Sequence, residues 1–431
     1  MTERTIAVNY LARVEGEGAL RVRIRDRTVE EVELRIFEPP RFFEAFLRGR
    51  AYAEAPDVTA RICGICPVAY QMSACHAMER ALGIRVDGAL RDLRRLLYCG
   101  EWIESHTLHI YLLHAPDFLG YPDALRLARD HPDAVQRGLA LKKAGNSIMR
   151  VLGGREIHPI NVRVGGFYRC PSPEELAELR GSVEHALALA EETVRFVAGF
   201  DFPNVEEDYE FVALRHPDEY PLNEGRIESS TGLSIDAAEY EGAFEEVQVA
   251  HSNALQSVRK GGGSYLVGPM ARYALNRDRL TPRARALARE VGLEDVVRNP
   301  FRSVIVRAVE VVFACEEAIR IIDRYRTPDR SWVEPPAIDR PSHGAAATEA
   351  PRGMLYHRYD LNADGSIATA RIVAPTSQNQ KRIEDDLRHL VARSLDLDEP
   401  ALTAACEHAI RNHDPCISCA THFLSLDLVR E

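Results

Sequence analysis

The sequence of 431 residues predicts an α+β fold that is mainly helical: one large intertwined domain, residues 1–431, with a central helical bundle and peripheral β-hairpins. Three observations support this prediction. Long stretches have apolar residues at helical spacing, shorter stretches alternate apolar and polar residues as strands do, and two similar cysteine pairs stand near opposite ends of the chain. No repeat or low-complexity linker divides the chain, so one domain is favoured over several independent ones.

Strands are expected first within residues 5–37, where apolar and polar positions alternate around a turn at Asp26-Arg27. Residues 356–373 alternate again around Asn362-Ala-Asp-Gly365, which is typical of a second hairpin. The segment between the last long helix and this hairpin, residues 327–353, is rich in proline and glycine.

Helices are expected over most of the remaining chain. A helix begins at Pro67, and a further one is expected after Asn379. The stretch Ser172-Pro-Glu-Glu175 is a capping box with proline in the first turn. The longest periodic segments are residues 88–114, 132–152, 172–198 and 299–325.

Two Cys-x-x-Cys pairs, Cys63 with Cys66 and Cys416 with Cys419, are the strongest chemical signal. Zinc ribbons have their pairs roughly 15–20 residues apart, which these are not, and a disulfide is typical of secreted proteins. A metal site closed by the whole fold is therefore favoured. Soft thiolates select zinc, iron clusters, copper(I) or nickel, so the spacing leaves the metal open. A helix beginning at Pro67 lowers the thiolate pKa of the first pair, which suits a ligand.

The bulk properties exclude several classes of partner. A net charge of −11 argues against nucleic acid or an anionic membrane surface. The sequence shows no signal-like apolar segment at its start and no apolar run near the roughly 20 residues that span a bilayer, so a cytoplasmic location is expected. The other five cysteines are expected to be buried as small apolar residues.

Four motifs in order resemble those of the large, catalytic subunit of nickel–iron hydrogenases. The two cysteine motifs are Arg61-Ile-Cys-Gly-Ile-Cys66 and Asp414-Pro-Cys-Ile-Ser-Cys-Ala-Thr-His422. The other two are Arg13-Val-Glu-Gly16 and Glu349-Ala-Pro-Arg-Gly353. Each motif alone is weak evidence, whereas the four together indicate this family.

The resemblance implies the roles of the four cysteines. Cys63 and Cys416 would be terminal nickel ligands, and Cys66 and Cys419 would bridge nickel to an iron that carries two cyanides and one carbon monoxide. Glu15 would hydrogen-bond to Cys416 and relay protons. The local sequence around Glu15, taken alone, is typical of an ordinary exposed glutamate on a strand edge.

The resemblance also implies a group of residues above the metals. Arg352 would donate to a cyanide, with Pro351 packed beside it, and its planar guanidinium suits that acceptor. Asp117 and Asp414 would flank Arg352, since a buried arginine needs acidic partners. Alone, Arg352 would be a solvated loop residue and Asp414 a turn residue before proline.

A second metal, magnesium or calcium, is implied near the C-terminus, bound by Glu44, the backbone carbonyl of Ile372, and His422. Residues 423–431 follow His422 as a tail that a maturation endopeptidase removes in the family after nickel insertion. Cleavage is the favoured expectation here, although retention as a terminal strand is physically possible.

Two features point to a subtype. Tyr70 and Glu17 each stand where many family members have a histidine, and the chain is shorter than those of the membrane-bound enzymes. Both resemble the soluble, multisubunit NAD(P)-linked hydrogenases. The chain has no further cysteine set and no Gly-x-Gly-x-x-Gly motif, so iron–sulfur clusters, FAD and NAD(P) are expected on partner subunits only.

The expected partners are a small subunit with iron–sulfur clusters, flavin and iron–sulfur subunits of the diaphorase type, a maturation endopeptidase and a nickel chaperone. The alternatives are a hydrogen sensor, or a non-catalytic relative such as the quinone-site subunit of complex I, which lacks the four cysteines. His106, His109 and His114 look like a metal cluster, but they are expected to be packing residues because no carboxylate is spaced to complete the set.

Overall fold

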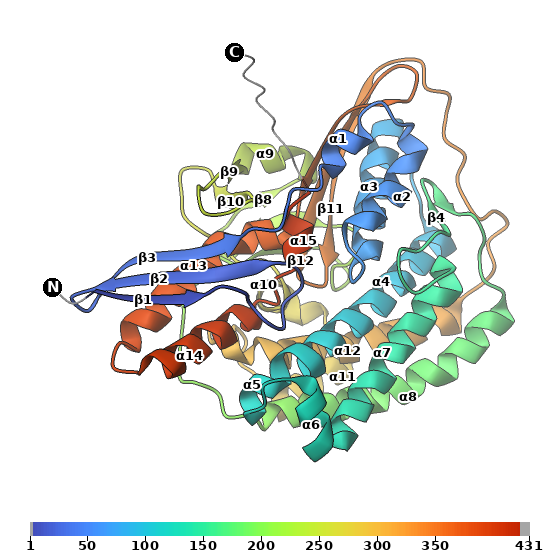
Figure 1. Ribbon diagram of the computed structural model, residues 1–431. Helices are drawn as coiled ribbons and strands as arrows, with labels where there is room; N and C mark the ends of the chain where they lie inside the picture. Colours follow the sequence, from blue (N-terminus) through green and yellow to red (C-terminus); the bar gives the residue numbers. More distant parts are fainter. Residues whose placement is uncertain (1–2, 423–431) are drawn as a thin grey trace, which may run out of the picture.

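A computed structural model describes residues 3–422 of the chain, and the expected tail 423–431 lies outside them. Its N-terminal strands β1 (Glu3–Val8), β2 (Gly18–Arg25) and β3 (Thr28–Ile36) form one antiparallel sheet (Figure 1). Asp26 and Arg27 make the predicted turn with positive φ angles of 46° and 64°, as a type I′ turn requires. One face of the sheet buries its apolar residues against α13 (Pro375–Arg393) and α14 (Glu399–Asn412).

The long helices pack together below this sheet in Figure 1. They are α4 (Gly88–Leu108), α7 (Pro132–Gly153), α8 (Pro173–Ala198) and α12 (Ser303–Arg324). Helix α12 contacts α4 and α8, and α7 contacts the same two helices. The predicted capping box forms at Ser172 and Glu175. Two predicted helices differ from the structure at one terminus. The helix predicted over residues 88–114 changes to a π-helical turn at His109–His114, and the helix predicted over residues 299–325 is preceded by a 3-10 turn, Pro300–Arg302.

Helix α3 (Pro67–Leu82) begins at Pro67 as predicted and packs on a second antiparallel sheet, β11-β12-β13. Its strands are Ser342–Ala350, Gly353–Leu361 and Ile367–Val373. The helix and sheet approach so closely at Gly344 that a β-carbon there would lie 2.1 Å from the carbonyl oxygen of Ala77. Only glycine therefore fits at this contact.

The sequence did not predict strand β11 or the hairpin that it forms with β12. The turn of the β11–β12 hairpin consists of Pro351 and Arg352 alone, because Ala350 pairs with Gly353. Gly353 has a φ of 138°. The later hairpin, β12–β13, was predicted from the alternation of residues 356–373. Strand β11 was missed because both of its faces are buried, so it has no alternating pattern.

Helix α13 begins at Pro375, five residues before the start predicted after Asn379. Its first turn is polar in sequence but buried in the fold. The side-chain amide of Asn379 accepts from the backbone N–H of Val267 and donates to its carbonyl, which satisfies a buried polar group. A polar first turn hid the true start of the helix.

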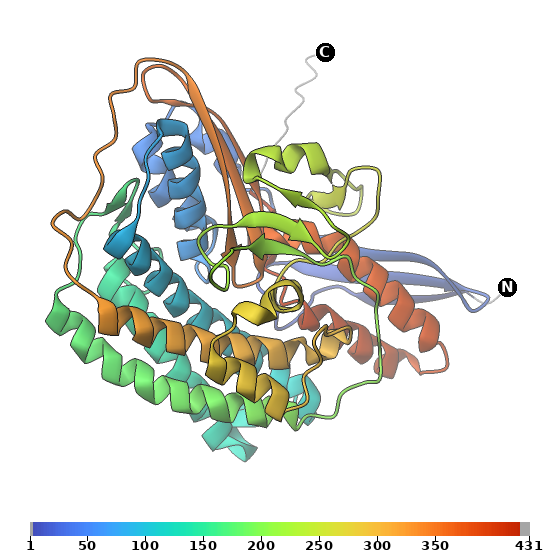
Figure 2. The same cartoon turned by 180° about the vertical axis from the view of Figure 1, so that it is seen from behind.

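The remaining elements are short. The helices are α1 (Phe43–Leu47), α2 (Ala55–Thr59), α5 (Ala115–Leu119), α6 (Ala124–Asp130), α9 (Tyr240–Ala243), α10 (Pro269–Asn276), α11 (Pro282–Glu290) and α15 (Ile417–Ala420). The strands are β4 (Val162–Arg163), β5 (Gly166–Phe167), β6 (Val212–Arg215), β7 (Arg226–Ser229), β8 (Ser234–Ile235), β9 (Phe244–Val247) and β10 (Gln256–Arg259). Figure 2 shows the small sheets β6–β8 and β9–β10 beside β11–β13, where they share a cluster of buried apolar residues.

The prediction of mixed helix and strand is confirmed. Within residues 3–422, none of the helices is both long and apolar enough to cross a membrane.

A buried charge network joins the helices to the β11–β12 hairpin. The guanidinium of Arg272 lies 2.7 Å from Glu310 and 3.1 Å from Glu349, and Glu310 also contacts His106 at 2.9 Å. All four side chains are fully buried. Although burial raises the pKa of Glu310, the Arg272 guanidinium outweighs it and holds this pKa at about 2. Arg272 also donates to the carbonyl of Pro351, so the network fixes the hairpin turn.

Replacing Glu310 by glutamine is expected to destabilise the fold by about 3–5 kcal/mol, because Arg272 keeps a buried charge without its main partner. The apparent Tm at one scan rate measures the effect. Because the folded pKa is depressed, this contribution is present above pH ~4.3 and is lost as pH falls toward 2. Glu290→Gln, which breaks an exposed pair with Arg195, should leave the Tm almost unchanged. Equal Tm values for wild type and Glu310→Gln would contradict this account.

Candidate metal centre

The four cysteines of the two pairs converge at one buried point. The sulfur atoms of Cys63 and Cys416 lie 3.5 Å apart, as do those of Cys66 and Cys419, and Cys416 lies 2.8 Å from Cys419. Sulfur ligands on one tetrahedral metal with bonds of ~2.3 Å stand about 3.8 Å apart, and the two separations of 3.5 Å are close to this value. All four sulfur atoms lie within 4.8 Å of one another, so they can serve as one donor set for a metal. All cysteines of the chain are free, which excludes the disulfide alternative.

Local structure prepares the first pair for a metal. Cys66 is the residue before helix α3, and the backbone N–H groups of Ile65 and Cys66 both donate to the sulfur of Cys63 at 3.3 Å. Hydrogen bonds from the other three cysteines, that from Cys416 first, hold the pKa of Cys63 well below its ordinary value. Cys63 is therefore suited to be a thiolate ligand.

The N-terminal arm of the chain reaches the second pair. Glu15 and Cys416 form a parallel bridge in which Ile417 donates its N–H to the carbonyl of Glu15 at 2.9 Å. The Glu15 carboxylate accepts from the Cys416 thiol and from the N–H of Ser418, both at 3.0 Å. Burial raises the pKa of Glu15. The structure thus places an acid that can hold a proton directly beside one of the thiols.

A glycine permits this close approach. Gly16 has a φ of 89°, and a β-carbon there would lie 2.7 Å from the side chain of Ile417 and 2.9 Å from the N–H nitrogen of Ser418. Any larger residue would push the arm away from the cysteine cluster. The Arg-Val-Glu-Gly motif therefore needs its glycine for contact as well as for conformation.

Arg352 lies at the tip of the β11–β12 hairpin and is 3% exposed. It donates to the carboxylate of Asp414 at 3.0 Å and to the Asp414 carbonyl at 2.8 Å. Its third contact, with the hydroxyl of Ser105, is 3.4 Å. Pro351 precedes Arg352 in the turn, and its carbonyl accepts from Arg272. The buried guanidinium of Arg352 is thus held by the carboxylate of Asp414, two residues before Cys416.

Asp117 does not flank Arg352, which corrects the expectation from the resemblance. Both of its oxygens accept from Arg411, at 2.7 and 2.8 Å, and Arg13 donates at 2.5 Å. Arg411 also donates to the carbonyl of Ala12. Burial raises the pKa of Asp117, but the hydrogen bonds from Arg411 and Arg13 lower it overall. Asp117 therefore ties the N-terminal arm to helix α14.

The three residues of the expected hard-cation site lie together. The imidazole of His422 contacts the carbonyl of Ile372 and lies 4.0 Å from the carboxylate of Glu44, which accepts the N–H of Ile372 at 2.7 Å. Burial raises the pKa of Glu44 to about 7. Sequence reasoning missed Glu246 on β9. Burial, with a smaller contribution from the Glu44 carboxylate, raises the pKa of Glu246 to about 7, although Arg371 lies 3.2 Å away.

Tyr70 occupies the position of the family histidine on α3 and is fully buried. Its hydroxyl donates to the carbonyl of Cys419 at 3.4 Å. Burial raises the pKa of Tyr70 well above its ordinary value, so this residue donates a hydrogen bond and does not exchange protons near neutral pH.

A second group of potential ligands contains His114, Asp117 and His408, whose ligand atoms lie within 4.8 Å of one another. Carboxylates therefore do approach two of the three helical histidines, Asp117 at His114 and Glu310 at His106, which the sequence did not suggest. The Asp117 carboxylate already forms ion pairs with the guanidinium groups of Arg13 and Arg411, and their positive charge opposes the binding of a cation. His106 and His109 contact Glu310 and the carbonyl of Arg411, as packing residues do.

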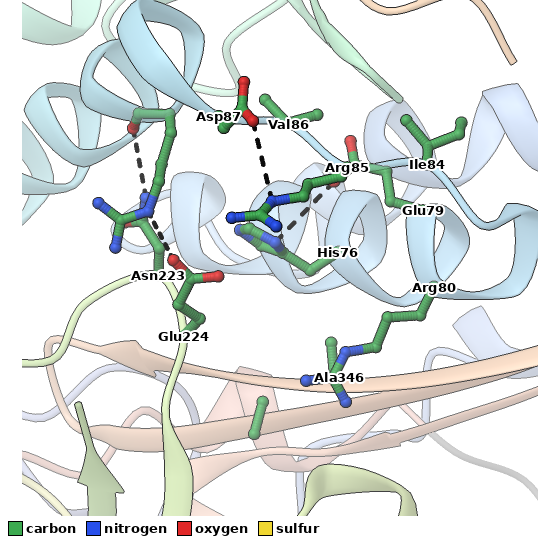
Figure 3. Close-up of a pocket in the computed structure, with 12 residues that line it drawn as sticks. His76, Glu79, Arg80, Ile84, Arg85, Val86, Asp87, Asn223, Glu224 and Ala346 are labelled. Carbon is green, nitrogen blue, oxygen red and sulfur yellow. Dashed lines mark hydrogen bonds and ion pairs between the residues drawn. The ribbon is translucent and has the colours of Figure 1, made fainter. Parts of the chain in front are cut away.

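Figure 3 shows a pocket of about 170 Å³ between α3, the start of α4 and residues 223–224. Its charged side chains face one another: Arg91 contacts Glu224 at 2.5 Å, and His76 lies 3.9 Å from Glu79. None of the four clustered cysteines lines it. The pocket is therefore separate from the metal centre, and its paired charges specify no ligand.

The comparison with known proteins fits this geometry. The profile of the family described as nickel-dependent hydrogenase matches residues 41–137 and 255–422, more than half of the chain. The chain belongs to this family. The matched regions contain both cysteine pairs, Arg352 and the residues around Glu44.

Several nickel-dependent hydrogenases are similar over their full length. Sulfhydrogenase 1 subunit alpha of Pyrococcus furiosus is 33% identical over 428 residues, with 98% of each chain covered. The NAD-reducing hydrogenase HoxS subunit beta of Cupriavidus necator is 28% identical, with 98% of this chain and 95% of that subunit covered. A crystal structure of an NAD+-reducing NiFe-hydrogenase in the H2-reduced state superposes with a TM-score of 0.87 at 27% identity, covering 97% and 99% of the two chains. This chain is a nickel–iron hydrogenase large subunit.

Asp117→Asn is expected to loosen the N-terminal arm of this large subunit, since a neutral amide cannot hold both Arg13 and Arg411. Hydrogen–deuterium exchange measured by mass spectrometry should show faster uptake in peptides covering residues 9–17. Asp396→Asn, which removes only an exposed pair with Arg27, is the matched control and should leave that uptake unchanged. Wild-type uptake in Asp117→Asn would refute the clamp.

Proposed function

We propose that this chain catalyses reversible heterolytic cleavage and formation of H2 and that its electrons pass through iron–sulfur and flavin subunits to NADP or NAD. The observation that supports the chemistry best is the Glu15 carboxylate 3.0 Å from the Cys416 thiol inside a cluster of four cysteines. A base in hydrogen-bond contact with a metal-site thiol is placed to accept the proton from H2. The names of the NAD-reducing relatives support the acceptor.

In this proposal Cys63 and Cys416 are terminal ligands of nickel, and Cys66 and Cys419 also hold an iron that carries two cyanides and one carbon monoxide. When bound, this Ni–Fe centre supplies the site where H2 is polarised and its electrons are accepted. The four thiolates hold the two metals, and their burial keeps bulk water away. The low pKa of Cys63 favours the thiolate form that a metal needs.

The proton path of the proposal begins at Glu15. Because burial raises its pKa, Glu15 can hold a proton taken from the sulfur of Cys416. Ser418 lies next, with its N–H on Glu15 and its hydroxyl donating to Glu38 at 2.9 Å. Glu38 is only partly buried, so it can pass the proton toward solvent. Ser418 thus lies between the two carboxylates, bound to Glu15 through its N–H and to Glu38 through its hydroxyl.

Arg352 and the hard-cation group have supporting roles in the proposal. Arg352, held by Asp414, would donate to a cyanide of the bound centre, with Pro351 beside it in the turn. Glu44, the Ile372 carbonyl and His422 hold magnesium or calcium. The partly buried Glu44 carboxylate has no arginine or lysine within 4.0 Å among residues 3–422, which supports a cation as its counter-charge. Asp117 acts only on the position of the arm.

The small subunit is proposed to dock beside the first cysteine pair. Gly64 is exposed there, and a β-carbon on it would lie 3.8 Å from Ile157. Ile157, Ile160 and Tyr168 are 58%, 52% and 53% exposed, an apolar surface close to the metals. Diaphorase-type subunits, a nickel chaperone and a maturation endopeptidase complete the proposed partners. A hydrogen-sensing role has the same ligand set, and turnover of purified protein separates it from catalysis.

Cys416→Ser is expected to abolish H2-dependent dye reduction and to lower bound nickel, because an alcohol replaces thiolate poorly as a ligand for a soft metal. Elemental analysis and the dye assay measure both effects. Cys170→Ser, at a partly buried cysteine outside the cluster, is the control and should retain nickel and activity. Normal nickel and activity in Cys416→Ser would overturn the proposed centre.

Glu15→Gln should reduce proton-dependent turnover and H/D exchange at least about 10²-fold while nickel and iron stay bound, because the amide keeps the shape but cannot pass a proton. Glu17→Gln changes an exposed residue of the same arm and should exchange at the wild-type rate. If Glu15→Gln also exchanges at that rate, protons leave by another path.

A further inference from the structure

Glu101 on helix α4 is a fully buried acid without a basic partner. Its exposure is 0%, and within residues 3–422 no lysine, arginine or histidine lies within 4.0 Å of its carboxylate. Burial raises its pKa well above the ordinary value. An unpaired buried carboxyl group is costly, and such groups concentrate at functional sites. Nothing in the sequence around Glu101 distinguishes it from other helical glutamates.

The carboxylate of Glu101 binds the start of helix α3. It accepts hydrogen bonds from the N–H of Val68 at 2.6 Å and from the N–H of Ala69 at 3.2 Å. Glu101 lies 33 positions after Val68 in the chain. No side chain of the preceding residues caps this helix. Glu101 therefore supplies from another helix the acceptor that a helix start requires.

The same few amides also serve the metal centre. The N–H groups of Ile65 and Cys66 point to the sulfur of Cys63, and Pro67 has no N–H. The next two N–H groups are those that Glu101 holds. Every available amide from residue 65 to residue 69 is thus assigned, two to a thiolate and two to Glu101. A shift of Glu101 would turn the segment that contains both cysteines of the first pair.

Helix α4 is a firm base for such a contact. Its backbone meets that of α7 so closely that a β-carbon on Gly145 would lie 2.6 Å from the carbonyl oxygen of Gly100. One turn after Glu101, Glu104 contacts Lys142 of α7 at 2.6 Å. The next residue, Ser105, accepts from Arg352. One rigid helix therefore touches the first cysteine pair and the hairpin tip above the second.

We propose that Glu101 is a positioning residue that fixes the Cys63–Cys66 loop against α4 and so sets the direction of both thiolates toward the metals. This role rests on the proposed ligand function of the two cysteines. The simpler possibility is that Glu101 only stabilises the first turn of α3. The two differ in whether the metal site responds when Glu101 is changed.

The test compares Glu101→Gln and Glu101→Ala with Asp92→Asn, which changes a half-buried acid near the start of the same helix. Glutamine keeps the volume of Glu101 but replaces one of its two accepting oxygens by an amide group that donates. Deuterium uptake in nickel-free protein is expected to rise about fivefold in peptides covering residues 63–70 for both Glu101 variants, as the loss of one hydrogen bond implies. In nickel-loaded Glu101→Gln, the infrared bands of cyanide and carbon monoxide should shift, while Asp92→Asn should match wild type in both measurements.

Two results would overturn the role. Unchanged uptake in both Glu101 variants would show that the carboxylate does not hold the loop. Faster uptake with unshifted infrared bands at wild-type nickel content would reduce Glu101 to a cap of α3. If wild-type protein contained no nickel and showed none of these bands, the proposed function would be rejected, and the positioning role with it. The uptake data would still report whether Glu101 binds the α3 amides.

Discussion

The meeting of the two cysteine pairs is the constraint on which the rest of this structure depends. The pairs stand near opposite ends of the chain, yet the sulfur of each cysteine in one pair lies 3.5 Å from a sulfur of the other pair. A parallel bridge between Glu15 and Cys416 brings the N-terminal arm to the same point. The start of α3, the arm and the C-terminal motif must therefore all be in place before a four-thiolate site exists. Local unfolding of any one of them opens the site.

Buried charges hold these segments in position. Arg352 pairs with Asp414 at the hairpin tip, and Arg272 joins the same hairpin to helix α12 through Glu310. Asp117 ties the arm to α14 through two arginines. Such pairs add little net stability compared with apolar packing, but breaking one leaves an unpaired charge in the interior. Their orientation requirements specify one arrangement of segments that are distant in sequence.

Acids without an arginine or lysine partner form the other half of the site's electrostatics. Glu101 is fully buried and Glu15 and Glu44 are partly buried, and burial raises the pKa of each. Glu15 and Glu101 contact opposite cysteine motifs, one through a thiol and the other through helix amides. Low dielectric thus favours proton-holding carboxyl groups around a centre whose proposed chemistry moves protons.

The sequence by itself determined the elements with local signals, namely the turn at Asp26-Arg27, the capping box at Ser172 and the start of α3. The order of the four motifs in addition indicated that the two cysteine pairs form one site. Periodicity, capping and motif order depend on neighbours in the chain, so they can be read without coordinates. Only the tertiary structure decided that Asp117 binds Arg13 and Arg411, that α13 begins at Pro375 and that Glu101 caps α3. Those choices depend on which distant groups a buried polar atom meets, because each such atom must find a partner wherever the fold supplies one.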